Sequence, residues 1–123
     1  SLIGNSSITS HDFSNNSQLV GLVLSGTGLS NLDLSGLTDL TALNVANTPL
    51  SGTLDLSGLP SLAQLFTQNT ALGILNIKNG NNTNMTTMRA DNNPNLVCIE
   101  VDTPITIIPN GWQKDAQASF STS

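Results

Sequence analysis

The sequence of 123 residues is short of charged and of aromatic side chains. Only 9% of its residues are charged and 3% are aromatic, and its formal net charge is −5. A protein that binds nucleic acid needs Lys and Arg to displace counterions from the phosphates. This chain has only three such residues, so we expect no nucleic acid partner. The same shortage argues against binding to an anionic membrane surface.

Cysteine, histidine and long apolar runs are equally scarce. Cys98 is the single cysteine, which excludes a disulfide within the chain. No apolar run approaches the roughly 20 residues that a membrane-spanning helix needs, so we expect no membrane insertion. His11 is the single histidine, and the sequence shows no nucleophile–base arrangement, metal-ligand cluster or phosphate loop. We therefore expect neither enzymatic activity nor a cofactor.

What the sequence has in abundance is leucine at regular intervals. Segments of the form L-x-x-L-x-apolar begin at Leu19, Leu40, Leu62 and Met85, in steps of 21, 22 and 23 residues. Similar segments form a second series half a period later. A period near 22 with two short strands is typical of one coil of a solenoid. The second series begins at Ile8, Leu29, Leu50, Leu72 and Leu96.

The two series predict two walls of the coil, which we call face A (first series) and face B (second series). Alternate residues of a strand point to opposite sides, so the first, fourth and sixth positions of each segment should point inward. Thr67 occupies such a position on face A, and its hydroxyl therefore needs a partner such as a backbone carbonyl. On face B, His11 and Phe13 should also point inward.

These patterns predict a β-rich solenoid of about five turns with parallel strands on two faces. The solenoid should span residues 1–102, with coils at about 1–18 (partial), 19–39, 40–61, 62–84 and 85–102. Residues 3–8 align with residues 24–29 at an offset of 21. We therefore expect that further coils or another domain of the same polypeptide precede the chain.

After Asp102 the period stops, and residues 103–123 are predicted to cap the open end of the core. The stretch 103–109 is apolar and β-branched, which favours an extended segment. Trp112, Ala116 and Phe120 lie four residues apart, as on one face of a helix. We therefore expect a short helix that lays two aromatic rings over the core, with a ligand-stacking Trp112 as the alternative.

The first series also resembles a known family. Leu40-x-x-Leu43-x-Val45-x-x-Thr48-x-Leu50 is similar to the leucine-rich repeat, L-x-x-L-x-L-x-x-N-x-L, over about residues 1–102. The resemblance implies a right-handed coil whose Asn side chains bond backbone groups at a turn and form a ladder. The Asn position is occupied here by Ser6, Thr27, Thr48, Thr70 and Asn93.

A second resemblance covers about residues 75–120. It is carried by Leu75-Asn-Ile-Lys-Asn-Gly-Asn-Asn-Thr-Asn84, by Asp91-Asn-Asn-Pro-Asn-Leu-Val-Cys-Ile-Glu-Val-Asp102, and by Trp112 and Asp115. These segments are similar to the terminal module of secreted repeat proteins from Bacteroidetes bacteria. The resemblance implies a protein that is secreted, extracellular or on the outer cell surface.

The outward residues of face A are the candidate binding site. Phe66 should lie beside Arg89 on the next coil, about 4.8 Å away, and an exposed aromatic ring beside Arg is typical of a binding hot spot. The alternative is that Phe66 only packs under the stem of Arg89. We predict a recognition module for a protein or glycan, with a structural spacer as the alternative. The candidate residues are Gln64, Phe66, Gln68, Thr87, Arg89 and Asp91.

Two further columns of side chains leave alternatives open. Face B carries an acidic column of Asp12, Asp33, Asp55 and Glu100, interrupted by Asn76. It either binds a cation such as Ca²⁺, or its Asp residues bond to the nearby Ser14, Ser35 and Ser57. The column of Thr27, Thr48 and Thr70 points either inward or outward, and a flat outward array of Thr is the kind of surface that ice-binding solenoids use.

Overall fold

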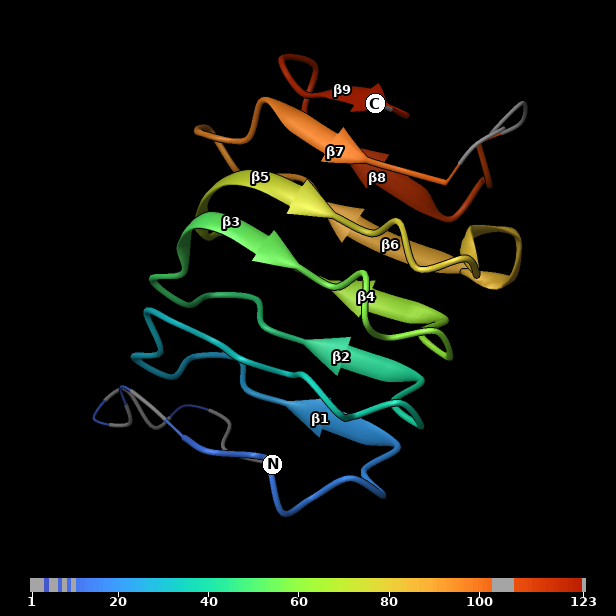
Figure 1. Ribbon diagram of the computed structural model, residues 1–123. Coiled ribbons are helices and arrows are strands. Elements are labelled where there is room, and N and C mark those ends of the chain that lie inside the picture. The colour runs from blue at the N-terminus through green and yellow to red at the C-terminus, as the bar shows by residue number, and fades with distance from the viewer. Residues whose placement is uncertain (1–3, 5–6, 8, 10, 103–107, 123) are drawn as a thin grey trace.

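The computed structural model describes residues 4, 7, 9, 11–102 and 108–122. They form a β-solenoid of about four turns, with one parallel sheet on each of the two predicted faces (Figure 1). Sheet A, on face A, contains β1 (Gly21–Val23), β2 (Ala42–Asn44), β4 (Gln64–Phe66), β6 (Thr87–Ala90) and β8 (Trp112–Lys114). Sheet B, on face B, contains β3 (Ser51–Asp55), β5 (Ala71–Asn76), β7 (Cys98–Glu100) and β9 (Ser119–Ser121). A 3₁₀ turn at Asn82–Asn84 lies between β5 and β6.

The core lies between the two sheets and consists of stacked columns of apolar side chains. Each column takes one inward residue from every coil, because the parallel strands pair with equivalent residues in register. Sequestering such a side chain from water stabilises the fold by about 1.5–3 kcal/mol. The sheet A column is Leu22, Leu43, Leu65, Met88 and Trp112, and the sheet B column is Leu54, Leu75, Ile99 and Phe120.

The predicted inward positions of face A are confirmed. Every one of them from Leu22 to Ala90 is buried, and Leu19 is half-buried at the start of its coil. Thr67 is buried as well, and its hydroxyl donates a hydrogen bond to the carbonyl oxygen of Arg89 at 3.0 Å. Thr67, which interrupts the apolar pattern, therefore links two neighbouring coils through this hydrogen bond.

Face B differs from the prediction in its early coils. Residues 29–34 were expected to form a strand, yet no strand is present there, and Ile8 lies outside the described residues. Leu50 and Leu54 are four residues apart, whereas Leu29 and Leu32 are three apart. The pairing of β3 with β5 shifts in register between Gly52 and Thr53: these consecutive residues pair with Leu72 and Ile74, so Gly73 lies opposite no residue of β3. The extra residue of this bulge is therefore on β5.

The inward placement of His11 is also wrong. Its side chain is exposed, and its ring lies against the buried Phe13 with the ring centroids 4.5 Å apart. Residues 11–13 form no strand, so the strict alternation of sides on which that prediction rested does not apply to them.

The predicted C-terminal helix is wrong. Trp112 begins β8, which pairs with β6, and Phe120 lies in β9, which pairs with β7. Residues 108–122 therefore extend both sheets, whereas the predicted extended segment falls largely on residues 103–107, outside the described part. Trp112 and Phe120 do come together, with ring centroids 5.8 Å apart. Two strands of one coil produce that contact, and Ala116 between them is exposed.

A turn that the sequence reasoning missed recurs after β2, β4 and β6 of sheet A. Asn47, Asn69 and Asn92 adopt left-handed backbone angles, with φ of 59°, 57° and 58°. Asn tolerates this region better than most residues. The side-chain amide of Asn69 donates to the Oδ1 atom of Asn47 at 2.8 Å. An Asn–Asn contact between coils therefore exists, one residue before the position where the resemblance places the Asn ladder.

Candidate recognition surface on sheet A

The predicted site residues lie together on the outer side of sheet A. Gln64 on β4 pairs with Thr87 on β6, and Phe66 pairs with Arg89. Gln68 and Asp91 follow directly after these two strands. Side chains two residues apart on a strand share one side of the sheet. The predicted adjacency of Phe66 and Arg89 is therefore confirmed, whereas binding at this site stays a prediction.

A shallow groove extends from Phe66 toward the N-terminal coils. It encloses about 210 Å³ and its exposed surface is mainly apolar. Gly21 and Ala42 carry the smallest outward side chains of β1 and β2, so the sheet is hollow between them and the ring of Phe66. The sequence reasoning noted small residues in the early coils but did not include them in the site. The groove is lined by Gly21, Leu22, Val23, Ala42, Leu43, Asn44, Gln64 and Phe66.

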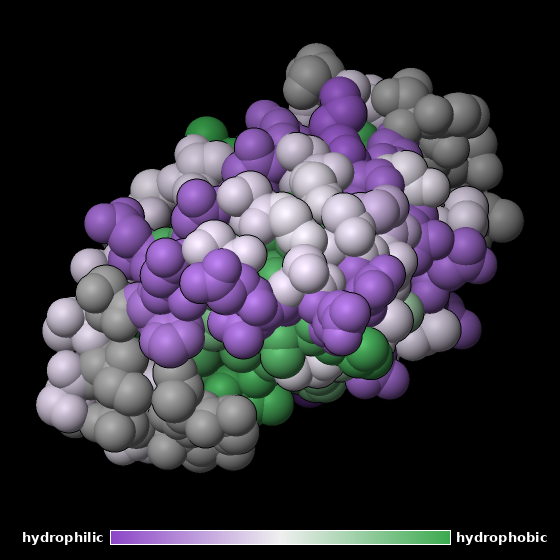
Figure 2. All heavy atoms as spheres, turned by 60° about the horizontal axis from the view of Figure 1, so that its bottom comes forward, coloured by the Kyte–Doolittle hydropathy of each residue, from purple (hydrophilic) through white to green (hydrophobic). Residues whose placement is uncertain are grey.

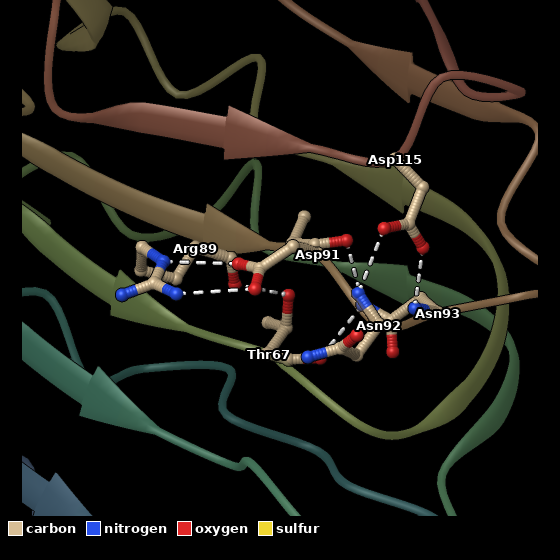
Figure 3. A network of polar contacts seen from close by, with 7 residues as sticks. Thr67, Arg89, Asp91, Asn92, Asn93 and Asp115 are labelled. Atoms are coloured by element: carbon tan, nitrogen blue, oxygen red, sulfur yellow. Dashed lines mark hydrogen bonds and ion pairs between the residues drawn. The ribbon is translucent and has the colours of Figure 1, made fainter.

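Arg89 is held by an ion pair that the sequence reasoning did not foresee. Its Nε and Nη2 atoms donate to Asp91 Oδ1 and Oδ2 at 2.9 and 3.1 Å (Figure 3). These bonds lower the pKa of the Asp91 carboxyl and raise the pKa of Arg89. The guanidinium is thus fixed in a planar, bidentate geometry at the edge of the surface. The signal in the sequence is the i, i+2 spacing of opposite charges on one strand side.

Gln68 contributes a polar atom without a partner. Its Oε1 atom is buried and accepts no hydrogen bond within the described part of the chain. Buried acceptors are usually satisfied, because an unsatisfied one costs about 1–3 kcal/mol. The Oε1 atom of Gln68 is therefore a buried, unsatisfied acceptor next to the end of β4.

The turn beneath this surface is held by Asn93, the one residue that matches the Asn of the leucine-rich-repeat pattern. Its buried amide donates to the carbonyl oxygens of Thr67 and Ala90, each at 2.9 Å. Its Oδ1 atom accepts from the backbone N–H and the hydroxyl of Thr70. The carboxylate of Asp115 accepts the backbone N–H groups of Asn92 and Asn93 (Figure 3). These bonds fix the strand ends that present Gln68 and Asp91.

The Thr column points inward, which rules out the ice-binding array. Thr27, Thr48 and Thr70 are 3%, 5% and 8% exposed. The hydroxyls of Thr27 and Thr48 each donate to a carbonyl three residues earlier, at 2.8 Å. Only Thr70 reaches the next coil, through Asn93. Among the described residues, the ladder implied by the resemblance is therefore confined to one step.

The acidic column of face B is engaged in local turns. Asp12, Asp33 and Asp55 each accept the backbone N–H two residues later, at 2.8–2.9 Å, and Asn76 makes the same bond. The backbone N–H groups of Ser14 and Ser35 lower the pKa of Asp12 and Asp33 below the ordinary value of 3.8, and the side chain and backbone N–H of Ser57 do the same for Asp55. Over the described ranges, no three acidic, His or Cys side chains come close enough to hold a metal ion.

No protein-family model, curated protein or solved structure matches the chain. Separately, the described part of the chain holds no helix that is long and apolar enough to cross a membrane.

Proposed function

We propose that this chain is a non-enzymatic recognition module of the leucine-rich-repeat type that binds a protein or a glycan through the outer side of sheet A. The observation that carries the proposal is the apolar groove of about 210 Å³ beside Phe66. A half-buried aromatic ring at the wall of a groove is a suitable anchor for a partner. The Arg89–Asp91 pair lies on the neighbouring strand.

The side chains that line this groove favour a ligand whose contacting surface is uncharged or weakly charged. Phe66 and Val23 supply apolar contact area, and the side chains of Asn44 and Gln64 supply amide donors and acceptors at the rim. Aromatic rings flanked by amides can hold the apolar side of a sugar ring and its hydroxyls, or an apolar side chain and its backbone. The groove is shallow, so the partner must supply a protruding group.

The proposal also includes the type of repeat and the cellular location of the protein. The repeat spacing and the buried bonds of Asn93 to two carbonyls support the leucine-rich-repeat type. Location outside the cell, in a secreted or cell-surface protein of a bacterium, rests on the resemblance over about residues 75–120. The same resemblance supports a binding role within a larger polypeptide.

The test is binding of the purified protein to an immobilised panel of host glycans and extracellular matrix proteins. Phe66→Ala and Arg89→Ala should each weaken binding about tenfold or more, as expected for hot-spot residues. Val97→Ala is a matched control, because Val97 is 59% exposed and directly precedes β7 in sheet B.

Circular dichroism and thermal unfolding of every variant establish that the fold is retained. Binding that is equal in wild type, Phe66→Ala and Arg89→Ala would contradict the proposal. An absence of binding across the panel would favour a structural spacer with no ligand of its own.

A further inference from the structure

A second groove opens on the opposite side of the molecule, between residues 32–35 and β3. It encloses about 380 Å³, within the range of about 300–1,000 Å³ that is typical of ligand sites. Figure 2 shows apolar atoms exposed in a gap between hydrophilic side chains on the side that carries the N-terminal coils. The groove is lined by Leu32, Asp33, Leu34, Ser35, Thr53, Asp55, Ser57, Gly58 and Leu59.

The groove exists because two coils are paired on one face only. On sheet A, β1 and β2 are in register from Gly21 to Val23. On face B, β3 is the first strand of its sheet and pairs only with β5. Across the described residues, no backbone hydrogen bond joins 29–35 to β3. One edge of β3 therefore presents unpaired N–H and C=O groups to the groove, which is the template that an added strand uses.

The electrostatics of the groove select the charge of an occupant. Asp33 and Asp55 line it from the two coils. The pKa of Asp33 is lowered by the backbone N–H of Ser35, and the pKa of Asp55 by the side chain and the backbone N–H of Ser57. Residues 1–77 contain four carboxylates and no Lys or Arg. The three basic residues, Lys78, Arg89 and Lys114, all belong to later coils. The groove is thus anionic, and neither of the two coils that line it contains a Lys or Arg.

We propose that this groove binds an extended, Lys- or Arg-bearing peptide segment that adds to the free edge of β3. The peptide backbone pairs with β3, its basic side chains meet Asp33 and Asp55, and its apolar side chains contact Leu32, Leu34 and Leu59. The site is separate from the surface on sheet A and does not depend on it. Backbone pairing gives affinity and the two carboxylates give selectivity for a basic sequence.

The probe is a fluorescein-labelled hexapeptide of alternating Lys and Val, titrated with the protein and followed by fluorescence anisotropy. Two matched peptides are controls: Glu replaces Lys in one, and a central Pro replaces Val in the other. The Lys peptide should bind, and the Glu peptide should bind at least about tenfold more weakly, because it faces like charges. The Pro peptide should also bind more weakly, since it lacks a backbone donor.

The variants are designed so that the fold survives. Asn76 makes the same turn bond, at 2.9 Å, that Asp33 and Asp55 make. The double variant Asp33→Asn/Asp55→Asn therefore keeps the turns and removes the charge. It should weaken binding of the Lys peptide about three- to tenfold at low salt. Asp39→Asn, an exposed carboxylate outside the groove, is the charge-matched control.

Gly58→Phe tests the groove by filling it. A Cβ atom on Gly58 would meet no atom within 4 Å, so the substitution should be accommodated. The variant should abolish peptide binding while its thermal unfolding stays near that of the wild type. Equal binding of the Lys and Glu peptides, or binding that persists in Gly58→Phe, would overturn the proposal. Self-association that Gly58→Phe abolishes would show that a second copy of the chain is the occupant, which would also overturn it.

Discussion

At the scale of single residues, the turn after each sheet A strand depends on which polar side chain is present. Asn93 satisfies four backbone or hydroxyl groups, whereas Thr27 and Thr48 each satisfy one carbonyl of their own coil. The hydroxyls of Thr27 and Thr48 therefore bond only within their own coil. The repeats are therefore equivalent in shape but not in the bonds that tie one coil to the next.

Asn93→Ala should lower the free energy of unfolding by at least about 2 kcal/mol, because it leaves several buried groups of two coils unsatisfied. The measurement is urea unfolding followed by circular dichroism. Asn95→Ala, at an exposed position of the same turn, is the matched control and should stay within about 0.5 kcal/mol of wild type. Equal stability of the two variants would contradict the role given to Asn93.

At the scale of the elements, the sequence predicted the coil interior well and its ends poorly. Period and alternation together place Leu22, Leu43 and Leu65 correctly, because each coil repeats the same strand geometry. The C-terminal helix was wrong because Trp112 and Phe120 lie eight residues apart, a spacing that fits a helix as well as two strands joined by a turn. No residue pattern near Trp112 distinguishes a helix from two strands joined by a turn.

The candidate surface was predictable to a similar extent. Alternation places Phe66 and Arg89 side by side, and the register of β4 with β6 agrees. The groove beside Phe66 could not be predicted, because it depends on the combined shape of three coils. The groove next to β3 lies where no backbone hydrogen bond joins residues 29–35 to β3, and that missing pairing is visible only in the folded chain.

Gly111 provides a direct test of the strand β8. A Cβ atom at Gly111 would collide with the backbone carbonyl oxygen of Thr86, against which β8 packs. Gly111→Ala should therefore destabilise the protein by about 1–3 kcal/mol, as overpacking does. In a helix, the same change would stabilise by up to about 1 kcal/mol. Thermal unfolding distinguishes the two signs, and Gly58→Ala, in open space, is the control.

At the scale of the whole molecule, a chain with few charges places most of its carboxylates in structural bonds. Asp33, Asp55 and Asp115 accept backbone N–H groups, and Asp91 accepts from Arg89. Each of these carboxyls has a pKa below 3.8 in the folded protein. The unfolded chain therefore binds more protons than the folded chain when the pH falls.

Stability should accordingly be at its full value above about pH 5 and should decline as the pH falls from about 4 through the lowered folded values. Urea unfolding at a series of pH values between 7 and 2 measures this decline. The Asp33→Asn/Asp55→Asn variant keeps its turns, so its stability at pH 7 should stay near wild type while its acid decline becomes shallower. An unchanged acid decline would show that these carboxyls are not linked to folding.

We propose that this solenoid recognises a partner through the outer side of sheet A. Gly21→Trp is the most direct test, because Gly21 lines the groove and a Cβ atom there meets no atom within 4 Å. Binding to glycans and matrix proteins is measured for the wild type, Gly21→Trp and Gly58→Phe, each shown to be folded. We predict that only Gly21→Trp loses the binding. Retained binding in Gly21→Trp, or equal loss in both variants, would contradict the claim.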